Sequence, residues 1–258
     1  SLGANGLRLA ADLSLGGLIG AGRVQALFDA APLRAFLQRN LPLDGIAGGL
    51  RRRQLYAVAV TATGYHSGKA FTFIQGRRGH PTWNKSRRVA MPAVLGIDHV
   101  LASSAIPLVF PPVPLTVNGA GTFFGDGALR LVTPLSPAIR LGADRVFAVG
   151  VRCQDSADQL LRSEVGGDDP SALRRPPLPQ ICGVFMNAIF LDHLDADVDH
   201  LRRMNELVGA YSGEEPAARW PAAALREPMR VVEPLVVSPS QDIAIIAKTF
   251  AHRMPRVI

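Results

Sequence analysis

The chain has 258 residues, of which 48% are hydrophobic and 19% are charged, and its formal net charge is +7. These values fit a folded protein with a substantial core, and they exclude an intrinsically disordered chain. The positive charge fits either a solvated, Arg-rich surface or attraction to anionic lipid headgroups. Nucleic acid is not an expected partner, because no recognition module accompanies the charge.

The cysteine content and the hydropathy pattern limit the class of protein further. Cys153 and Cys182 are too few for a disulfide framework or a zinc site, so we expect reduced thiols in a cytoplasmic protein. Residues 100–125 carry no charge, but four prolines within them exclude a regular membrane-spanning helix. No signal peptide is visible in these residues.

The first half of the chain predicts two helices followed by two strands. Residues 7–22 are apolar and rich in glycine, in a pattern that suits a helix. Asp29 is a suitable cap for a second helix that ends near residue 39. Residues 55–62 form a continuous β-prone run, typical of a strand buried on both faces in a parallel sheet. Residues 70–75 then predict a returning strand.

The middle of the chain predicts alternating helices and strands. Residues 97–102 are helical by composition, and residues 122–125 predict a short strand. Ser136 is expected to cap a short helix that ends at Gly142, with a buried strand over residues 145–151 after it. This order of strand, helix and strand favours a parallel α/β sheet.

The last part of the chain predicts one long helix between two loops, then a strand and a final helix. Apolar residues recur at helical spacing over residues 186–208, and the opposite face of that helix is acidic and basic, as a solvated face would be. Residues 154–179 and 213–228 are expected to be loops. Residues 230–237 predict a strand, and Ser240 is a suitable cap for a helix to about residue 252.

One carboxylate stands out by its surroundings. Asp126 lies between Gly125 and Gly127, after an aromatic pair and before Ala128 and a proline at position 134. Gly127 and Ala128 add little bulk, so backbone or substrate can approach the carboxylate closely. An Asp-Gly pair by itself usually marks a turn. The sequence segments around Asp126 therefore decide whether it is interpreted as a turn residue or as a functional carboxylate.

Those segments, in their order, resemble the second half of a bacterial patatin-like phospholipase. The resemblance is carried by residues 101–113 (LASSAIPLVFPPV), by Asp126-Gly127-Ala128, and by residues 134–151, and weaker similarities extend over nearly the whole chain. It implies a three-layer α/β fold with a mostly parallel central sheet. It also implies hydrolysis of a lipid ester by a Ser–Asp dyad, in which Asp126 is the general base, with no histidine, metal or organic cofactor.

The nucleophile of that dyad is less clear than its base. No complete Gly-x-Ser-x-Gly occurs in these residues, and only Ser1-Leu-Gly-Ala could be the second half of one. Ser1 is therefore the candidate nucleophile, and the alternative is a chance match. Ser103 and Ser104 belong to a segment of small residues without a strand–turn–helix elbow, so we interpret them as packing residues.

The resemblance also implies that the N-terminal part of the family fold is missing. Residues 1–258 would form one partial domain, with a core to about residue 152, a loop over residues 153–179 and an extension over residues 180–258. We therefore expect the chain by itself to lack activity. A non-catalytic α/β module that binds lipid or another protein is the alternative. Close relatives in the family commonly have Asn at the position of Val132, so the resemblance implies less efficient catalysis here and the same fold.

Overall fold

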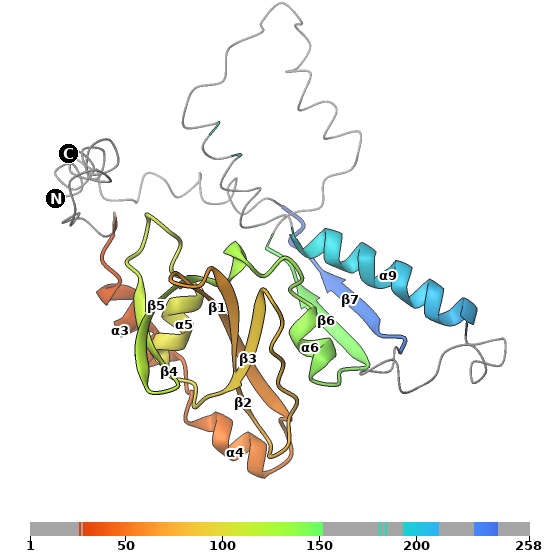
Figure 1. Ribbon diagram of the computed structural model, residues 1–258, viewed down its shortest axis with the longest axis horizontal. Helices are drawn as coiled ribbons and strands as arrows, with labels where there is room; N and C mark the ends of the chain where they lie inside the picture. The colour runs from red at the N-terminus through yellow and green to blue at the C-terminus, as the bar shows by residue number, and fades with distance from the viewer. Residues whose placement is uncertain are drawn as a thin grey trace, which may run out of the picture. The chain divides into compact units, whose positions relative to one another are not determined.

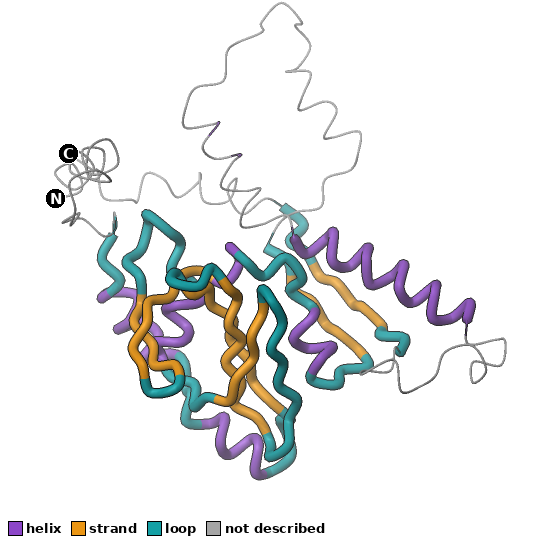
Figure 2. Tube along the Cα trace, viewed as in Figure 1, coloured by secondary structure: helices purple, strands orange, loops and turns teal. Residues whose placement is uncertain are grey.

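The computed structural model describes residues 26, 28–151, 181, 184, 193–211 and 230–241 (Figure 1). The chain divides into two compact units, the first formed by Ser1–Val132 with Pro255–Ile258 and the second by Thr133–Met254. Helices and strands alternate in both units (Figure 2), so the mixed α/β class is confirmed. Each unit is described by itself below.

The first unit is built on a five-stranded sheet with the strand order β3-β2-β1-β5-β4. Its strands are β1 (Ala57–Gly64), β2 (Lys69–Gly76), β3 (Arg88–Pro92), β4 (Val113–Val117) and β5 (Ala120–Asp126). The β1–β2, β1–β5 and β4–β5 pairs are antiparallel, whereas β2 and β3 are parallel. The central strand β1 thus has an antiparallel neighbour on each side.

The short connections explain why β1 is not the parallel strand that its apolar run predicts. Only residues 65–68 join β1 to β2, and only Asn118 and Gly119 join β4 to β5. A parallel neighbour requires a crossover of a dozen residues or more, so connections of this length give antiparallel pairs. Asn118 and Gly119 both have positive φ angles, of 50° and 83°, as a two-residue hairpin turn demands. The returning strand expected after β1 is confirmed as β2.

The core of the first unit lies between this sheet and the helix α5 (Ile97–Ser103), which is also confirmed. Phe73 and Phe124 are fully buried, and their ring centroids lie 5.4 Å apart in an edge-to-face arrangement. Leu101 and Ala102 of α5 pack against them. Burial of one such aromatic side chain stabilises a fold by about 1.5–3 kcal/mol, so this cluster fixes α5 on the sheet.

Two further helices belong to the first unit, α3 (Ala31–Asn40) and α4 (Gly45–Arg51). The second helix expected from the sequence is confirmed as α3, but Asp29 is not its cap, because Ala30 precedes the helix without a side-chain cap. Asp29 Oδ1 instead accepts the N–H of Ala31 at 2.9 Å, from one residue further back. The sequence did not predict α4, β3 or β4. These elements are short, and α4 contains three glycines, which are poor helix formers.

The second unit contains a parallel pair of strands, β6 (Arg145–Val149) and β7 (Glu233–Val237). The order of strand, helix and strand over residues 122–151 predicted a parallel sheet, but its two strands, β5 and β6, lie in different sheets. Its described residues include the helices α6 (Ser136–Arg140) and α9 (His193–Tyr211). Val146 and Ala148 of β6 are buried in one cluster with Val198 and Leu201 of α9. Pro234 lies within β7, where it still pairs with Val146.

Two sequence expectations in the second unit are wrong. Ser136 does not cap α6, because the helix begins at Ser136 itself and Leu135 precedes it without a side-chain cap. Asp197 does not belong to a solvated helix face, because it is buried and its Oδ2 accepts the N–H of Leu135 at 2.8 Å. A buried carboxylate must be hydrogen-bonded, and a backbone N–H at the start of α6 fills that role. Gly142, with a φ of 103°, does end α6 as predicted.

Several expectations lie outside the described residues. They are the helices expected over residues 7–22 and 240–252, the loops expected over residues 154–179 and 213–228, the first turns of the helix expected from residue 186, and both cysteines.

Candidate active site around Asp126

Asp126 is the last residue of β5, and two elements hold its backbone in place. It pairs with Ala62 of the central strand β1. Its N–H donates to the carbonyl oxygen of Ala105, which lies just after the end of α5, at a distance of 2.9 Å. The carboxylate therefore projects from a position fixed by both the sheet and α5.

Gly127 brings the chain unusually close to β1 immediately after Asp126. It begins a short 3-10 turn, Gly127–Leu129, and it is buried. A Cβ at position 127 would overlap the carbonyl oxygen of Thr61 and lie 2.9 Å from the carbonyl carbon of that residue. Both obstructing atoms are backbone atoms of the central strand, so no side-chain rotation of a neighbour could make room for a side chain at position 127. The Asp-Gly pair is thus required by a close approach of two backbones.

The turn also orients the carboxylate. Asp126 Oδ1 accepts the N–H of Ala128 at 2.8 Å, which is the side-chain cap of the 3-10 turn. The other oxygen, Oδ2, accepts no hydrogen bond from the part of the chain that the structure describes. One oxygen is therefore held by the backbone while the other is available to a partner.

Burial changes the acidity of this group. It raises the pKa of Asp126 above its ordinary value of 3.8, although the hydrogen bond from Ala128 acts in the opposite direction. Burial disfavours the charged form, and the backbone N–H stabilises it. A half-buried carboxylate with a raised pKa and one free oxygen is a stronger base than an exposed aspartate. Chemically, it can accept a proton from a hydroxyl within hydrogen-bonding reach.

Tyr65 is a residue of this region that the sequence analysis missed. It follows β1 directly, and its hydroxyl occupies the space where a side chain of Gly125 would lie. Burial raises the pKa of Tyr65, and the charge of Asp126 raises it further. The available signal was its position, directly after the end of β1 that pairs with Asp126 and Gly125. Nothing in the local pattern distinguishes such a tyrosine from an ordinary turn residue.

The threonines of β1 have different environments. Thr61 and Thr72 join their hydroxyls across β1 and β2 at 3.1 Å. Thr63 is buried, and its hydroxyl has no hydrogen-bond partner among the described residues. The hydroxyl of Thr61 is therefore satisfied within the sheet, whereas that of Thr63 is left without a partner in the described residues.

The serines considered as nucleophiles are not brought to Asp126 by the described parts of the chain. Ser1 lies outside the described residues. Ser103 is the last residue of α5, and the hydroxyl of Ser104 donates to the carbonyl of Val100 at 3.0 Å. That bond fits the packing role at a helix end. Val132, which stands where Asn was expected, is 60% exposed.

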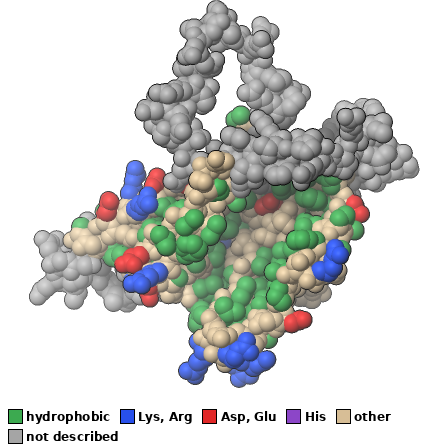
Figure 3. Space-filling view, turned by 180° about the vertical axis from the view of Figure 1, so that it is seen from behind, with side chains coloured by type: hydrophobic (Ala, Val, Ile, Leu, Met, Phe, Trp, Pro, Cys, Tyr) green, Lys and Arg blue, Asp and Glu red, His purple; other side chains and the backbone are tan. Residues whose placement is uncertain are grey.

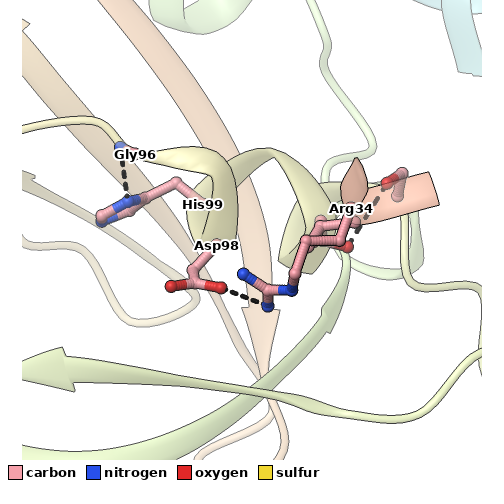
Figure 4. A network of polar contacts seen from close by, with 6 residues as sticks. Arg34, Gly96, Asp98 and His99 are labelled. Atoms are coloured by element: carbon pink, nitrogen blue, oxygen red, sulfur yellow. Dashed lines mark hydrogen bonds and ion pairs between the residues drawn. The ribbon is translucent and has the colours of Figure 1, made fainter. Parts of the chain in front are cut away.

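A cavity of about 590 Å³ lies at the other end of α5. Its lining includes Phe73, Met91 and Leu115 with Asp98 and His99 at its polar side, and Asp126 is not part of it. His99 Nδ1 accepts the N–H of Gly96 at 3.1 Å, and Asp98 forms an ion pair with Arg34 (Figure 4). Burial lowers the pKa of His99 in spite of the nearby charge of Asp98. These contacts give His99 a role in starting α5.

The described surface shows neither a metal site nor a spanning segment. Within residues 28–151, 193–211 and 230–241, no group of three or more His, Cys, Asp or Glu side chains is placed to hold a metal ion. The described helices also lack the length and apolar character needed to cross a membrane. Apolar side chains are nevertheless exposed among Lys and Arg side chains on the surface (Figure 3).

Comparison with known protein families gives one match. The family model described as patatin-like phospholipase matches residues 11–139, which is half of the chain and includes the Asp126-Gly127-Ala128 motif. Ser1 lies before the matched residues. Neither the curated proteins nor the solved structures contain a significant match to this chain.

Proposed function

The chain belongs to the patatin-like phospholipase family, a family of lipid acyl hydrolases, and on this premise we propose that Asp126 is the general base of a Ser–Asp dyad. The observation that supports the proposal most is the carboxylate itself. It is half-buried, its pKa is raised, one of its oxygens is held by Ala128, and its motif lies within the residues that match the family. Ser1 is the proposed nucleophile.

In the proposed reaction, the serine hydroxyl attacks the carbonyl carbon of a lipid ester while its proton passes to Oδ2 of Asp126. Backbone N–H groups stabilise the tetrahedral oxyanion. The acyl carbon–oxygen bond then breaks, and the proton held by Asp126 passes to the departing alcohol. Water, activated by the same carboxylate, hydrolyses the acyl-enzyme and regenerates the serine. No metal or organic cofactor takes part in this proposal.

We further propose that the protein is cytoplasmic and meets its lipid substrate at an anionic membrane surface. The net charge of +7 favours attraction to such a surface. Exposed apolar side chains offer contact with the acyl region. In the first unit the large ones include Phe28, Phe36, Leu108 and Phe123.

The experiment that tests the dyad replaces Asp126 by Asn. The protein to use is the chain extended by the residues encoded immediately before Ser1, with short- and long-chain esters as substrates. Asn keeps the size and can accept the Ala128 N–H, but it cannot take the serine proton. Turnover should fall by about 10²–10⁴-fold, chiefly in kcat, because apolar contacts hold the acyl chain. The melting temperature should change little.

A matched control separates catalysis from charge. Asp44 is an exposed carboxylate of the same unit, and it makes no side-chain cap to α4, so Asp44→Asn should leave turnover unchanged. If folded Asp126→Asn keeps near-normal turnover, the dyad assignment is wrong and the non-catalytic lipid-binding or interaction module becomes the better interpretation. Val132 in place of Asn would be a second argument for that module.

The chain of 258 residues by itself should not react with a fluorophosphonate probe for activated serines. Its residues contain no complete Gly-x-Ser-x-Gly, and a serine without a preceding strand is not held in an elbow. Stoichiometric labelling of any serine in this chain would contradict this expectation and would identify the nucleophile directly.

A further inference from the structure

The cavity at the start of α5 takes its lining from both edge strands of the five-stranded sheet. Residues 91–92 come from β3 and residues 114–116 from β4, and these two strands stand at opposite ends of the strand order. Phe73 and Leu115, which are buried, form its apolar floor, and Val94, which is 82% exposed, lies where it opens to solvent. Its volume of about 590 Å³ is within the range of small-molecule sites, roughly 300–1,000 Å³.

The walls of this cavity are held by hydrogen bonds that need no ligand. On one side, the N–H of Ala93 donates to the carbonyl oxygen of Ile74 at 2.9 Å. Next to it, the N–H of Leu95 donates to Oε1 of Gln75 at 2.9 Å. On the other side, the hairpin turn at residues 118–119 ties the end of β4 to β5. A site with fixed walls loses little conformational entropy when a ligand binds.

His99 supplies a hydrogen-bond donor to the cavity. Its Nδ1 accepts the N–H of Gly96, so in the neutral ring the proton is on Nε2, and no described residue accepts a hydrogen bond from that nitrogen. Figure 4 shows this second nitrogen at the outer end of the ring, away from α5. Burial lowers the pKa of His99, so the ring is neutral at neutral pH. The ring packs edge-to-face on Phe73, with 4.9 Å between the centroids, so the donor lies beside the apolar floor.

The charges around the cavity favour a ligand that has no charge. Among the described residues that line it, Asp98 is the charged one, and its side chain is 51% exposed and forms an ion pair with Arg34. A ligand carboxylate would be repelled by Asp98. A ligand ammonium would find that carboxylate already engaged, and it could not accept the proton on Nε2 of His99. An uncharged group with a carbonyl oxygen meets neither difficulty.

We propose that this cavity is a binding site for a small uncharged amphiphile, an amide or an ester with a short alkyl chain. The alkyl chain packs on Phe73, Met91 and Leu115, and the carbonyl oxygen accepts the Nε2–H of His99. Asp126 does not line the cavity, so this site is separate from the proposed hydrolysis and does not depend on it.

Methionine methyl signals test the site by NMR in the 258-residue chain. The chain has five methionines, and Met91 is the described one that lines the cavity. Its signal is assigned by its loss in Met91→Leu, which conserves the volume of the side chain. Hexanamide, the uncharged probe, should shift the Met91 signal until the site is saturated and leave the signal of Met204 in α9 unmoved. A Met91 signal that does not move up to the solubility limit of hexanamide overturns the proposal.

Three probes with the same alkyl chain test the preference for an uncharged ligand. Hexanamide should bind most tightly, and hexanoate should bind at least about 5-fold more weakly because Asp98 repels it. Asp98→Asn should remove most of this difference and leave the affinity for hexanamide nearly unchanged. Equal affinities for hexanamide, hexanoate and hexylammonium, as apolar contact alone would give, contradict the proposal. Tightest binding of hexylammonium contradicts it as well.

The last variant removes the donor. His99→Asn keeps an acceptor for the N–H of Gly96, but it lacks Nε2, so the affinity for hexanamide should fall by about 10-fold, the upper end of the contribution of one hydrogen bond. His66→Asn is the matched control, because His66 is exposed on the turn after β1 and does not line the cavity. If folded His99→Asn binds hexanamide as tightly as the parent chain, the proposal fails. If His99→Asn does not fold, the Met91 signal and Asp98→Asn decide between the same outcomes.

Discussion

Replacement of Gly127 by Ala should destabilise the first unit, because the close approach of two backbones leaves no room for a methyl group. The added Cβ would overlap the carbonyl oxygen of Thr61, which belongs to the central strand β1. Relief requires the turn after Asp126 to move away from β1. That movement strains the pairing of Asp126 with Ala62 and its hydrogen bond to Ala105.

The size of the effect follows from three contributions. Overpacking costs about 1–3 kcal/mol. Weakening of one backbone hydrogen bond adds about 0.5–1.5 kcal/mol. The reduced freedom of the unfolded chain offsets about 0.4–1 kcal/mol of this. The expected loss in the free energy of unfolding is therefore about 2 kcal/mol, from the central values of these ranges.

Urea unfolding measures this loss if the signal reports on the first unit alone. The chain has two tryptophans, and Trp83 lies buried in the first unit. With Trp220→Phe as the background, fluorescence follows Trp83. Gly121→Ala, in the strand β5 that precedes Gly127, is the control. A Cβ there meets nothing within 4 Å, so its effect should stay within about 0.5 kcal/mol.

The comparison of these two variants decides whether the reasoning holds. If Gly127→Ala unfolds at the same urea concentration as Gly121→Ala with an unchanged slope, the close approach to Thr61 does not exist. The structural explanation of the Asp-Gly pair would then be withdrawn.

Two further predictions concern the same unit. Burial lowers the pKa of His99 below 6.5, so the folded state binds fewer protons there than the unfolded state. Stability should therefore fall as the pH drops from about 6.5 through the lowered pKa. In His99→Gln, the free energy of unfolding should depend less on pH between roughly pH 5 and pH 7, the range around the ordinary pKa of histidine. Thr63→Val exchanges a buried hydroxyl that has no partner among the described residues for a methyl group of similar shape. The free energy of unfolding should therefore stay unchanged or rise by about 1 kcal/mol, and a loss of that size would reveal a hydrogen-bond partner of Thr63.

Local sequence pattern was sufficient to predict those elements in which residue propensities and hydrophobic periodicity indicate the same secondary structure. The helices α3 and α5 and the strands β2 and β6 were predicted in this way. The family was predicted from the order of motifs, because that order is read from the sequence without any knowledge of contacts. The family match over residues 11–139 confirms the prediction. Asp126 was selected for the same reason.

Contacts between distant residues decided what the sequence could not. The apolar run of β1 suits either strand direction, and only the four-residue connection to β2 and the pairing with β5 made it antiparallel. Asp197 reads as a solvated helix residue until α6 brings the N–H of Leu135 to it, 62 residues away. The position of the Tyr65 ring over Gly125 is visible only in the structure, where β5 lies beside β1. The sequence by itself determined the family and the candidate base, because both depend on local order. The strand directions and the surroundings of the carboxylate depend on which surfaces meet, and tertiary packing alone settles that.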